Sequence, residues 1–273
     1  MTETPRTTLI VGGNGKTGRR VAEGLRARGL PFRLASRSST PRFDWNDEET
    51  WARPLEGVGA AYLTYAPDLA VPWAAEQVGR FVRRAVEAGA GRLVLLAGRG
   101  EPHVFPAEDA VRQSGVIFTI LEAAFFAQNF SEGALVPIDG EIVFPGGEVR
   151  EPFIDVDDIA DVAVAALTED AHGGRTYDLT GPRLLTFAEA AREIADAARR
   201  PIRYRPVTSE EYARVLAPLM TAAEVAFLTD LFAQLTDGHN AHLADGVERA
   251  LGRPPRDFRA YARAAAAAGA WTP

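Results

Sequence analysis

The chain contains no cysteine among its 273 residues. This absence excludes disulfide bonds, thiolate nucleophiles, and zinc or iron–sulfur sites built on cysteine. Lysine is nearly absent too: Lys16 is the only one, and arginine supplies the other cations, a bias typical of GC-rich coding. The net charge of −7 argues against direct binding to nucleic-acid phosphates.

Long apolar runs are also missing. None approaches the ~20 residues that a membrane span requires. The first residues, MTETPRTT, are short and polar, unlike a signal or transit peptide. We therefore expect a cytoplasmic protein without membrane contact. Nothing in the sequence defines an oligomeric state.

What the first half of the chain does contain is an alternation of apolar, β-branched runs with helical patterns. This alternation predicts an α/β fold in which helices cover both faces of a doubly wound parallel sheet. Strands are predicted over 7–13, 31–37, 60–67, 91–98 and 116–123, helices over 16–28, 74–88 and 107–114, and a weaker strand over Arg42–Trp45.

After Phe130 the pattern changes. Residues 137–154 are rich in Gly and Pro and predict loops with a small hairpin. Thr186 and Glu189 have the spacing of a capping box at a helix start. Other predicted elements are helices over 155–169 and 186–200, strands over 175–182 and 201–207, and nearly continuous helix from 210 to the end.

The stretch LIVGGNGKTGRR places three glycines three residues apart at the first strand-to-helix junction. Gly12 allows the tight turn, Gly15 lets backbone N–H groups approach a pyrophosphate, and Gly18 lets the helix pack close to the sheet. The helix N-terminus then faces the anion. We predict a dinucleotide site that also includes Asn14, Lys16 and Thr17, a purely structural glycine turn being the alternative.

The end of the second strand distinguishes the two dinucleotides. NAD sites usually place an acidic residue there, to bind the ribose 2′-hydroxyl. This strand ends LASRSS, and Ser36, Arg37 and Ser38 are suited to a 2′-phosphate. NADP(H) is therefore the favoured cofactor, with NAD(H) kept open and Arg37 as a solvated loop residue the alternative. Asp44 is a candidate for the adenine amino group, or an ordinary turn aspartate.

Several motifs together resemble the NmrA-like proteins, atypical members of the short-chain dehydrogenase/reductase superfamily. They are VGGNGKTGRRVA, RFDWNDEETW, TILEAAFFAQNFSE, EPFIDVDDIADVAVAAL and YDLTGPRLLTFAEAA, and the resemblance runs from about Thr8 to Ala262. It is strongest toward the ergot-alkaloid reductases and the NAD(P)H:quinone oxidoreductases. It implies a Rossmann core over residues 1–130. Residues 131–273 would complete the sheet and form a smaller, mainly helical substrate subdomain of one integrated domain.

The resemblance also shows what this chain lacks. Catalytic short-chain dehydrogenases use a Tyr-x-x-x-Lys pair and a serine at the end of the strand written here as LVLLAG. No tyrosine lies four residues before a lysine, and Ala97 stands at the serine position, beside the cofactor. Reducing a simple ketone needs a proton donor, whereas reducing a quinone or an iminium ion needs chiefly orientation. The sequence therefore favours an electron-poor, aromatic small-molecule substrate.

Candidate residues for this chemistry follow the predicted strands. His103 is a candidate proton donor or a solvated loop histidine. Tyr65 is a candidate wall of the cofactor site. Candidate substrate-binding residues, for which core packing is the alternative, are Phe125, Phe126, Gln128, Asn129, Tyr212, Met220 and Phe227. His239 and His242 lack a helix-face metal pattern, so no metal site is expected.

Two functions fit these features best, and an isomerase or lyase that keeps the cofactor as a relic is a third interpretation. The first is an NAD(P)H-dependent reductase of a quinone-like or iminium-like aromatic compound. Its setting would be aromatic polyketide tailoring, as in antibiotic biosynthesis, where a dihydroquinone could react with oxygen to give net hydroxylation. The second is a non-enzymatic NAD(P)-binding redox sensor of the NmrA type. The aromatic segment EAAFFAQNF favours the enzyme.

Overall fold

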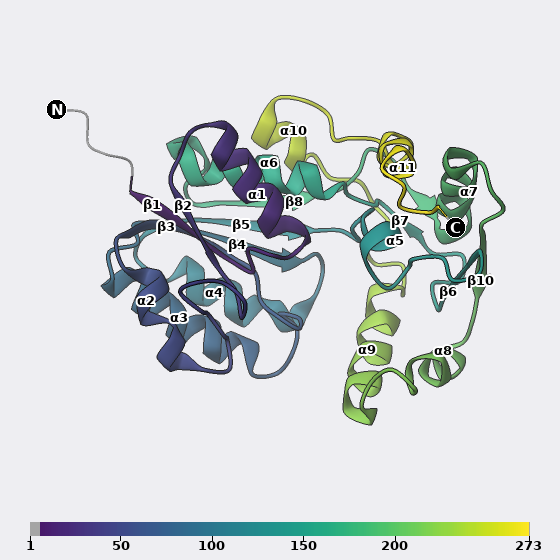
Figure 1. The fold of residues 1–273 in the computed structure, drawn as a ribbon, viewed down its shortest axis with the longest axis horizontal. Helices are drawn as coiled ribbons and strands as arrows, with labels where there is room; N and C mark the ends of the chain where they lie inside the picture. The colour runs from purple at the N-terminus through teal and green to yellow at the C-terminus, as the bar shows by residue number, and fades with distance from the viewer. Residues whose placement is uncertain (1–5, 273) are drawn as a thin grey trace. The chain divides into compact units, whose positions relative to one another are not determined.

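A computed structural model describes residues 6–272 and divides into two compact units. Unit 1 holds the chain up to Ala123 together with Val156–Leu179 and Asp245–Arg253. Unit 2 holds Ala124–Asp155, Thr180–Ala244 and the chain from Pro254 onward. The colour of the ribbon, which follows residue number, shows that each unit is assembled from separate stretches of the chain (Figure 1).

Unit 1 is built on a six-stranded sheet in which every neighbouring pair is parallel. The central strands are short, largely apolar runs buried on both faces, as parallel sheets require, whereas the two edge strands keep partly exposed side chains. The chain crosses from β1 (Thr7–Val11) to β2 (Phe32–Ala35) on one side and then to β3 (Val58–Leu63) on the other, so a topological switch point lies between β1 and β3. In spatial order the strands are β2 (Phe32–Ala35), β1 (Thr7–Val11), β3 (Val58–Leu63), β4 (Arg92–Gly98), β5 (Ile117–Ala123) and β8 (Arg175–Leu179).

Helices cover both faces of this sheet, which confirms the doubly wound fold (Figure 1). One face carries α1 (Lys16–Ala27), α6 (Val156–Thr168) and α10 (Gly246–Leu251). The other carries α2 (Ala52–Leu55), α3 (Ala74–Glu87) and α4 (Phe105–Arg112).

The predicted short strand over Arg42–Trp45 is wrong. In this segment Asp44 forms only an isolated bridge with Asp47, just before the 3₁₀ helix η1 (Glu48–Thr50). The alternating aromatic residues that mimic a strand are instead buried by packing on one ring of α3. Phe43, Trp45 and Trp51 lie 5.4, 5.2 and 5.5 Å from Phe81, measured between ring centroids.

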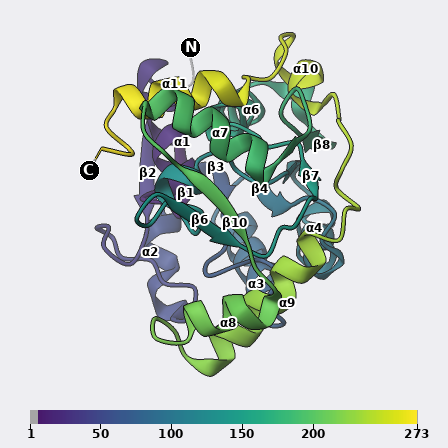
Figure 2. The same ribbon diagram turned by 90° about the vertical axis from the view of Figure 1, so that its right-hand side faces the viewer.

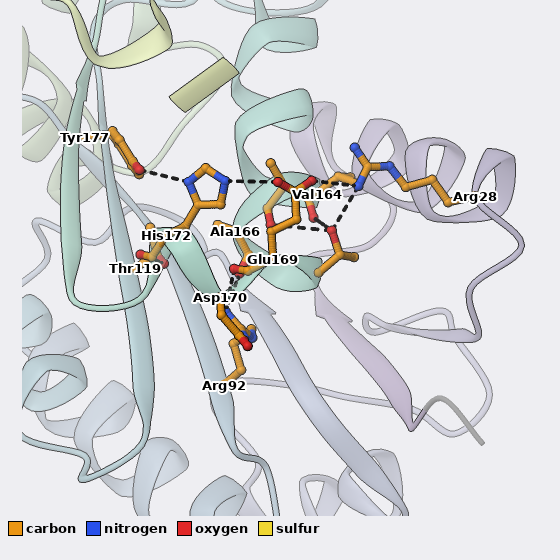
Figure 3. A network of polar contacts seen from close by, with 11 residues as sticks. Arg28, Arg92, Thr119, Val164, Ala166, Glu169, Asp170, His172 and Tyr177 are labelled. Carbon is orange, nitrogen blue, oxygen red and sulfur yellow. Dashed lines mark hydrogen bonds and ion pairs between the residues drawn. The ribbon is translucent and has the colours of Figure 1, made fainter. Parts of the chain in front are cut away.

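A polar network ties the end of α6 to the strands of unit 1 (Figure 3). Arg92, at the start of β4, donates to the carbonyl oxygen of Glu169 at 3.0 Å. Buried His172, in the 3₁₀ helix η3 (Asp170–His172), lies 2.8 Å from the hydroxyl of Tyr177 on β8. Arg28, which follows α1, pairs with the Glu169 carboxylate at 3.3 Å. This end of the sheet, opposite the glycine loop, is therefore held by structural contacts.

Unit 2 combines helices with two small sheets (Figure 2). The small hairpin predicted within 137–154 is limited to an isolated antiparallel bridge between Ile138 and Glu141. The longer strands of this segment pair with partners far along the chain. β6 (Glu141–Phe144) runs parallel to β10 (Arg203–Pro206), and β7 (Arg150–Glu151) runs antiparallel to β9 (Leu185–Thr186). The helices are α5 (Asn129–Glu132), α7 (Phe187–Ala198), α8 (Ser209–Leu216), α9 (Ala222–Leu235) and α11 (Phe258–Ala267).

The capping box predicted at the start of α7 is confirmed. The Glu189 N–H donates to the Thr186 hydroxyl at 3.1 Å, and the Thr186 N–H donates to the Glu189 carboxylate at 2.8 Å. The nearly continuous helix predicted after Glu210 is wrong. It is divided into α8, α9, α10 and α11, since Pro218 lies between the first two and Pro254 follows the third.

An aromatic core and an ion-pair clamp hold unit 2 together. The core gathers buried phenylalanines from α5, β6 and α7, with Phe130 and Phe153 at 5.3 Å between ring centroids. Arg183 bonds Asp257 through two nitrogens, at 2.6 and 2.9 Å, and Glu193 at 2.7 Å. Across residues 6–272, every helix is too short or too polar to cross a lipid bilayer.

Candidate functional site

The loop between β1 and α1 lies at the switch point of the unit 1 sheet. Gly12 adopts φ +74°, a conformation that favours glycine. A methyl group on Gly12 would lie 2.0 Å from the hydroxyl oxygen of Thr64, which follows β3 and donates to the Val11 carbonyl at 3.0 Å. The loop backbone therefore packs directly on the end of β3.

The other two glycines of the motif differ in what surrounds them. A methyl group on Gly18 would lie 2.3 Å from the Gly12 carbonyl oxygen, so close packing of α1 requires glycine there. A methyl group on Gly15 would meet only that same oxygen, at 3.1 Å, and otherwise open space. Gly15 is also the N-cap of α1 and gives it no side-chain cap, and the first helical turn carries no acidic residue. This helix N-terminus is accessible and suited to an anion.

A polar cluster stands beside this helix start, at the end of β2. The side-chain amide of Asn14 donates to the hydroxyls of Ser36 and Ser38, at 2.9 and 3.0 Å. Arg37 lies between the two serines and is exposed. The structure thus brings together the residues that the sequence assigned to a 2′-phosphate, and β2 itself carries no carboxylate.

Asp44 and Tyr65 have partners within unit 1. The Asp44 carboxylate accepts the Asn46 N–H at 3.1 Å and pairs with Arg42 at 2.8 Å, as a turn aspartate does. The Tyr65 hydroxyl donates to Gln77, and its ring lies 4.9 Å from that of Trp45. Contacts of both residues with a cofactor stay predictions.

The end of β4 is buried. Ala97, at the position where related enzymes carry serine, is 4% exposed and aligns in register with Glu122 of β5, which in turn aligns with Asp178 of β8. Arg99 is 3% exposed and binds the Asp178 carboxylate at 2.5 and 3.1 Å. A buried charge of this kind is held by its partner, so Arg99 has a structural role here.

Glu101 is the group at this edge that sequence reasoning missed. Burial raises its pKa to about 8, and the nearby carboxylate of Asp68 adds to the increase. His103, the histidine singled out from the sequence, is exposed on the 3₁₀ helix η2 (Pro102–Val104). Both residues follow the same strand, and only the folded structure distinguishes the enclosed carboxyl from the solvated ring.

A second group of carboxyls lies between β5 and α4. Fully buried Glu108 accepts a hydrogen bond from Arg112 at 2.8 Å, and Arg112 lies 4.0 Å from Glu122. Burial raises the pKa of Glu122 to about 6, and the charges of Glu108 and Asp178 raise it further. The arginine stabilises carboxylates that would otherwise be costly to bury.

The predicted substrate residues all belong to unit 2. Phe125 packs edge-on against Phe187, at 5.9 Å between ring centroids. Phe126 bridges Ile154 in parallel and is half-buried. The remaining residues of this segment are buried Gln128, whose amide donates to Asp155 at 2.7 Å, and half-buried Asn129 at the start of α5.

The three candidates further along the chain differ in burial. Tyr212 is buried on α8, 5.7 Å from Phe144 between ring centroids. Met220 is 40% exposed between α8 and α9, and Phe227 is half-buried on α9. Within residues 6–272, no group of three or more His, Asp or Glu side chains is arranged to hold a metal ion.

Comparisons of sequence place the chain among named oxidoreductases. It is 33% identical over 278 residues to agroclavine dehydrogenase of Claviceps fusiformis, covering 92% of this chain and 94% of that protein. It is 30% identical over 283 residues to NAD(P)H azoreductase of Xenophilus azovorans, covering 95% of this chain and 98% of that protein. No family model matches the chain.

Comparisons of structure support the fold. A nucleoside-diphosphate-sugar epimerase of Staphylococcus aureus aligns with a TM-score of 0.78 at 16% identity, over 94% of this chain and 99% of that one. The NADPH-dependent quinone oxidoreductase QOR2 of Escherichia coli, solved with NADPH, aligns with a TM-score of 0.76 at 18% identity, over 93% and 98%. At these identities the likeness shows the shared architecture.

Proposed function

Since the chain belongs to the NmrA-like family of NAD(P)H-dependent oxidoreductases, atypical short-chain dehydrogenases/reductases, we propose that it reduces an electron-poor aromatic compound with NADPH. The compound would be quinone-like or iminium-like. The observation that carries this proposal is the accessible start of α1 beside the Asn14, Ser36 and Ser38 cluster.

The residues of unit 1 fit a dinucleotide. The open space at Gly15 lets a pyrophosphate reach backbone N–H groups at the start of α1, and a side chain there would fill that space. Lys16 and Thr17, in the first turn of the helix, would complete the phosphate site. When bound, the nicotinamide supplies a hydride to the acceptor.

The end of β2 would select NADPH over NADH. A 2′-phosphate needs donors and positive charge, which the Ser36 and Ser38 hydroxyls and the Arg37 guanidinium provide. NADH would gain from a carboxylate at this place, and β2 has none. Hydrogen bonds from the Asn14 side-chain amide hold both serine hydroxyls in position.

The acceptor class follows from the missing acid. Without the Tyr-x-x-x-Lys pair, and with Ala97 in place of serine, no hydroxyl at the usual position can protonate an alkoxide. A quinone yields a weakly basic anion and an iminium ion yields a neutral amine, so both tolerate this loss. The names of the two relatives, an azoreductase and a dehydrogenase of agroclavine, fit acceptors of this electron-poor kind.

We assign substrate binding to unit 2. Phe126, Asn129, Met220 and Phe227 keep exposed surface, which suits contact with an aromatic compound. Half-buried Phe125 and the buried residues Gln128 and Tyr212 would support this surface from beneath. Aromatic polyketide tailoring, with oxygen converting a dihydroquinone to a hydroxylated product, is the setting we propose.

The alternative is an NAD(P)-binding redox sensor. It is favoured by the likeness to NmrA, titled a negative transcriptional regulator and solved with NAD, at a TM-score of 0.69 and 14% identity. Incubation with NADPH and a panel of quinones and iminium salts, followed by nicotinamide absorbance, separates the two. The reductase consumes NADPH only when an acceptor is present. Tight NADPH binding without consumption on any acceptor would support the sensor.

A further inference from the structure

The carboxyl of Glu101 lies directly on the end of β4. A methyl group built on Gly98, the last residue of that strand, would lie 1.8 Å from Glu101 Oε1 and 2.4 Å from its carboxyl carbon. The other oxygen, Oε2, is enclosed by protein and has no hydrogen-bond partner among the described residues. A buried carboxylate left without a partner is costly, whereas a carboxylic acid is not.

The charged groups around Glu101 favour its protonated form. Asp68, in the loop after β3, is a like charge that disfavours a second carboxylate nearby. Arg99, two residues before Glu101, binds the Asp178 carboxylate at 2.5 and 3.1 Å. His103, on the following 3₁₀ helix, is exposed. At neutral pH Glu101 therefore holds a proton at the carboxyl edge of the sheet, where ligands of such sheets bind.

We propose that Glu101 is the proton donor for acceptors whose reduced form is an anion, a role that rests on the proposed reductase function. It takes over at a different position the task that tyrosine performs in the catalytic short-chain dehydrogenases. Glycine at position 98 is required for this position of Glu101, because any side chain there would displace the Glu101 carboxyl.

Hydride addition to a quinone, with NADPH oxidised to NADP⁺, gives a hydroquinone monoanion. The O–H bond of Glu101 breaks and its proton forms the new O–H bond of the hydroquinone. The Glu101 carboxylate then takes a proton from water. An iminium ion becomes a neutral amine on hydride addition, so its reduction leaves Glu101 unchanged.

This difference between acceptors gives a sharp test. With 1,4-naphthoquinone, Glu101→Gln should lower kcat at pH 7 by about 10- to 100-fold, the lower part of the range for general acids, because the product anion is weakly basic. With N-methyl-3,4-dihydroisoquinolinium, kcat should stay within about twofold. Glu56→Gln, an exposed carboxyl before β3, is the matched control and should change neither. The wild-type quinone rate should fall at alkaline pH, and the Glu101→Gln rate should not.

A second measurement reports the proton without turnover. Infrared difference spectra of the unliganded protein, wild type minus Glu101→Gln, should show a protonated carboxyl band at pH 7 that disappears at alkaline pH. Gly98→Ala keeps the carboxyl of Glu101 but displaces it. In this variant the protonated carboxyl band at pH 7 should be weaker, and only quinone reduction should be slower.

The possible results distinguish the proton-donor role of Glu101 from the proposed reductase function. Wild-type turnover of both acceptors with an unaffected Glu101→Gln variant would overturn the inference and leave the reductase standing. An ionised Glu101 at pH 7 would overturn it as well. A wild type that turns over neither acceptor would refute both the reductase function and the donor role.

Discussion

Replacing Gly15 by alanine should leave the fold intact and abolish tight dinucleotide binding. Gly15 has φ −76° and ψ 175°, which any residue adopts, and the added methyl group meets only the Gly12 carbonyl oxygen at 3.1 Å. That contact is a few tenths of an ångström tight. Alanine also lowers the conformational entropy of the unfolded chain, which stabilises the folded protein by about 0.4–1 kcal/mol. This gain offsets the cost of the tight contact, so the net change in stability is small.

The effect on binding is much larger. The methyl group occupies the space through which a pyrophosphate reaches the start of α1. Losing one or two hydrogen bonds to a charged phosphate costs about 1.5–3 kcal/mol each. A total near 3 kcal/mol corresponds to a Kd raised about 100-fold.

Calorimetric titration of NADPH into wild type and Gly15→Ala measures this directly, with circular dichroism and urea unfolding to verify the fold. Gly91→Ala is the matched control. Gly91 precedes β4 with an ordinary φ, and a methyl group there meets only the Gly59 carbonyl oxygen at 3.9 Å. A folded Gly15→Ala protein that binds NADPH as tightly as wild type would refute the placement of the cofactor at this loop.

Four other variants or conditions test the 2′-phosphate contact, the raised pKa of Glu101, the aromatic core and the role of His103. Arg37→Ala should weaken NADPH binding by about 1.5–3 kcal/mol and leave NADH binding unchanged, as calorimetry with both cofactors would show; equal losses would contradict a 2′-phosphate contact. Stability should fall as pH rises from 5 to 8, because the native pKa of Glu101, about 8, lies above its unfolded value of 4.5 and the native state binds more protons in this window. Urea midpoints should show a shallower decline for Glu101→Gln, and parallel curves would contradict the raised pKa. Trp51→Ala removes a fully buried ring and should destabilise the protein by about 3–5 kcal/mol, and a loss under 1 kcal/mol would mean that the aromatic cluster is loosely packed. His103→Ala should reduce kcat/KM for a quinone less than Phe126→Ala does, and an inactive His103→Ala protein would show that its exposed imidazole is the essential acid.

The central strands of unit 1 were predictable because each is a largely apolar run that only a doubly covered parallel sheet can bury. The strand predicted over Arg42–Trp45 was wrong because the pattern of apolar residues alone does not show what buries them. Its alternating aromatics satisfy a strand pattern, yet they are buried by rings packed around Phe81. The turn residues of the 137–154 segment predict a hairpin, and they give only the bridge between Ile138 and Glu141, whereas β6 pairs with β10. Pairing between distant strands leaves no local signal.

The site divides along a similar line. The glycine loop was predictable since backbone geometry at Gly12 and Gly18 dictates the residue type. Glu101 was not, because its importance depends on how its side chain folds back onto Gly98 and on the charge of Asp68, which comes from the loop after another strand. Composition and spacing contain no information on which of two neighbouring polar side chains becomes buried.

Hydride transfer from NADPH to an electron-poor acceptor is tested most directly by a kinetic isotope experiment. Oxidation of NADPH and of NADPH dideuterated at the nicotinamide C4 is followed by absorbance with a panel of quinones and iminium salts. We expect NADPH oxidation that depends on the acceptor and is slower with the deuterated cofactor. Tight binding of NADPH with no oxidation on any acceptor in the panel would contradict it.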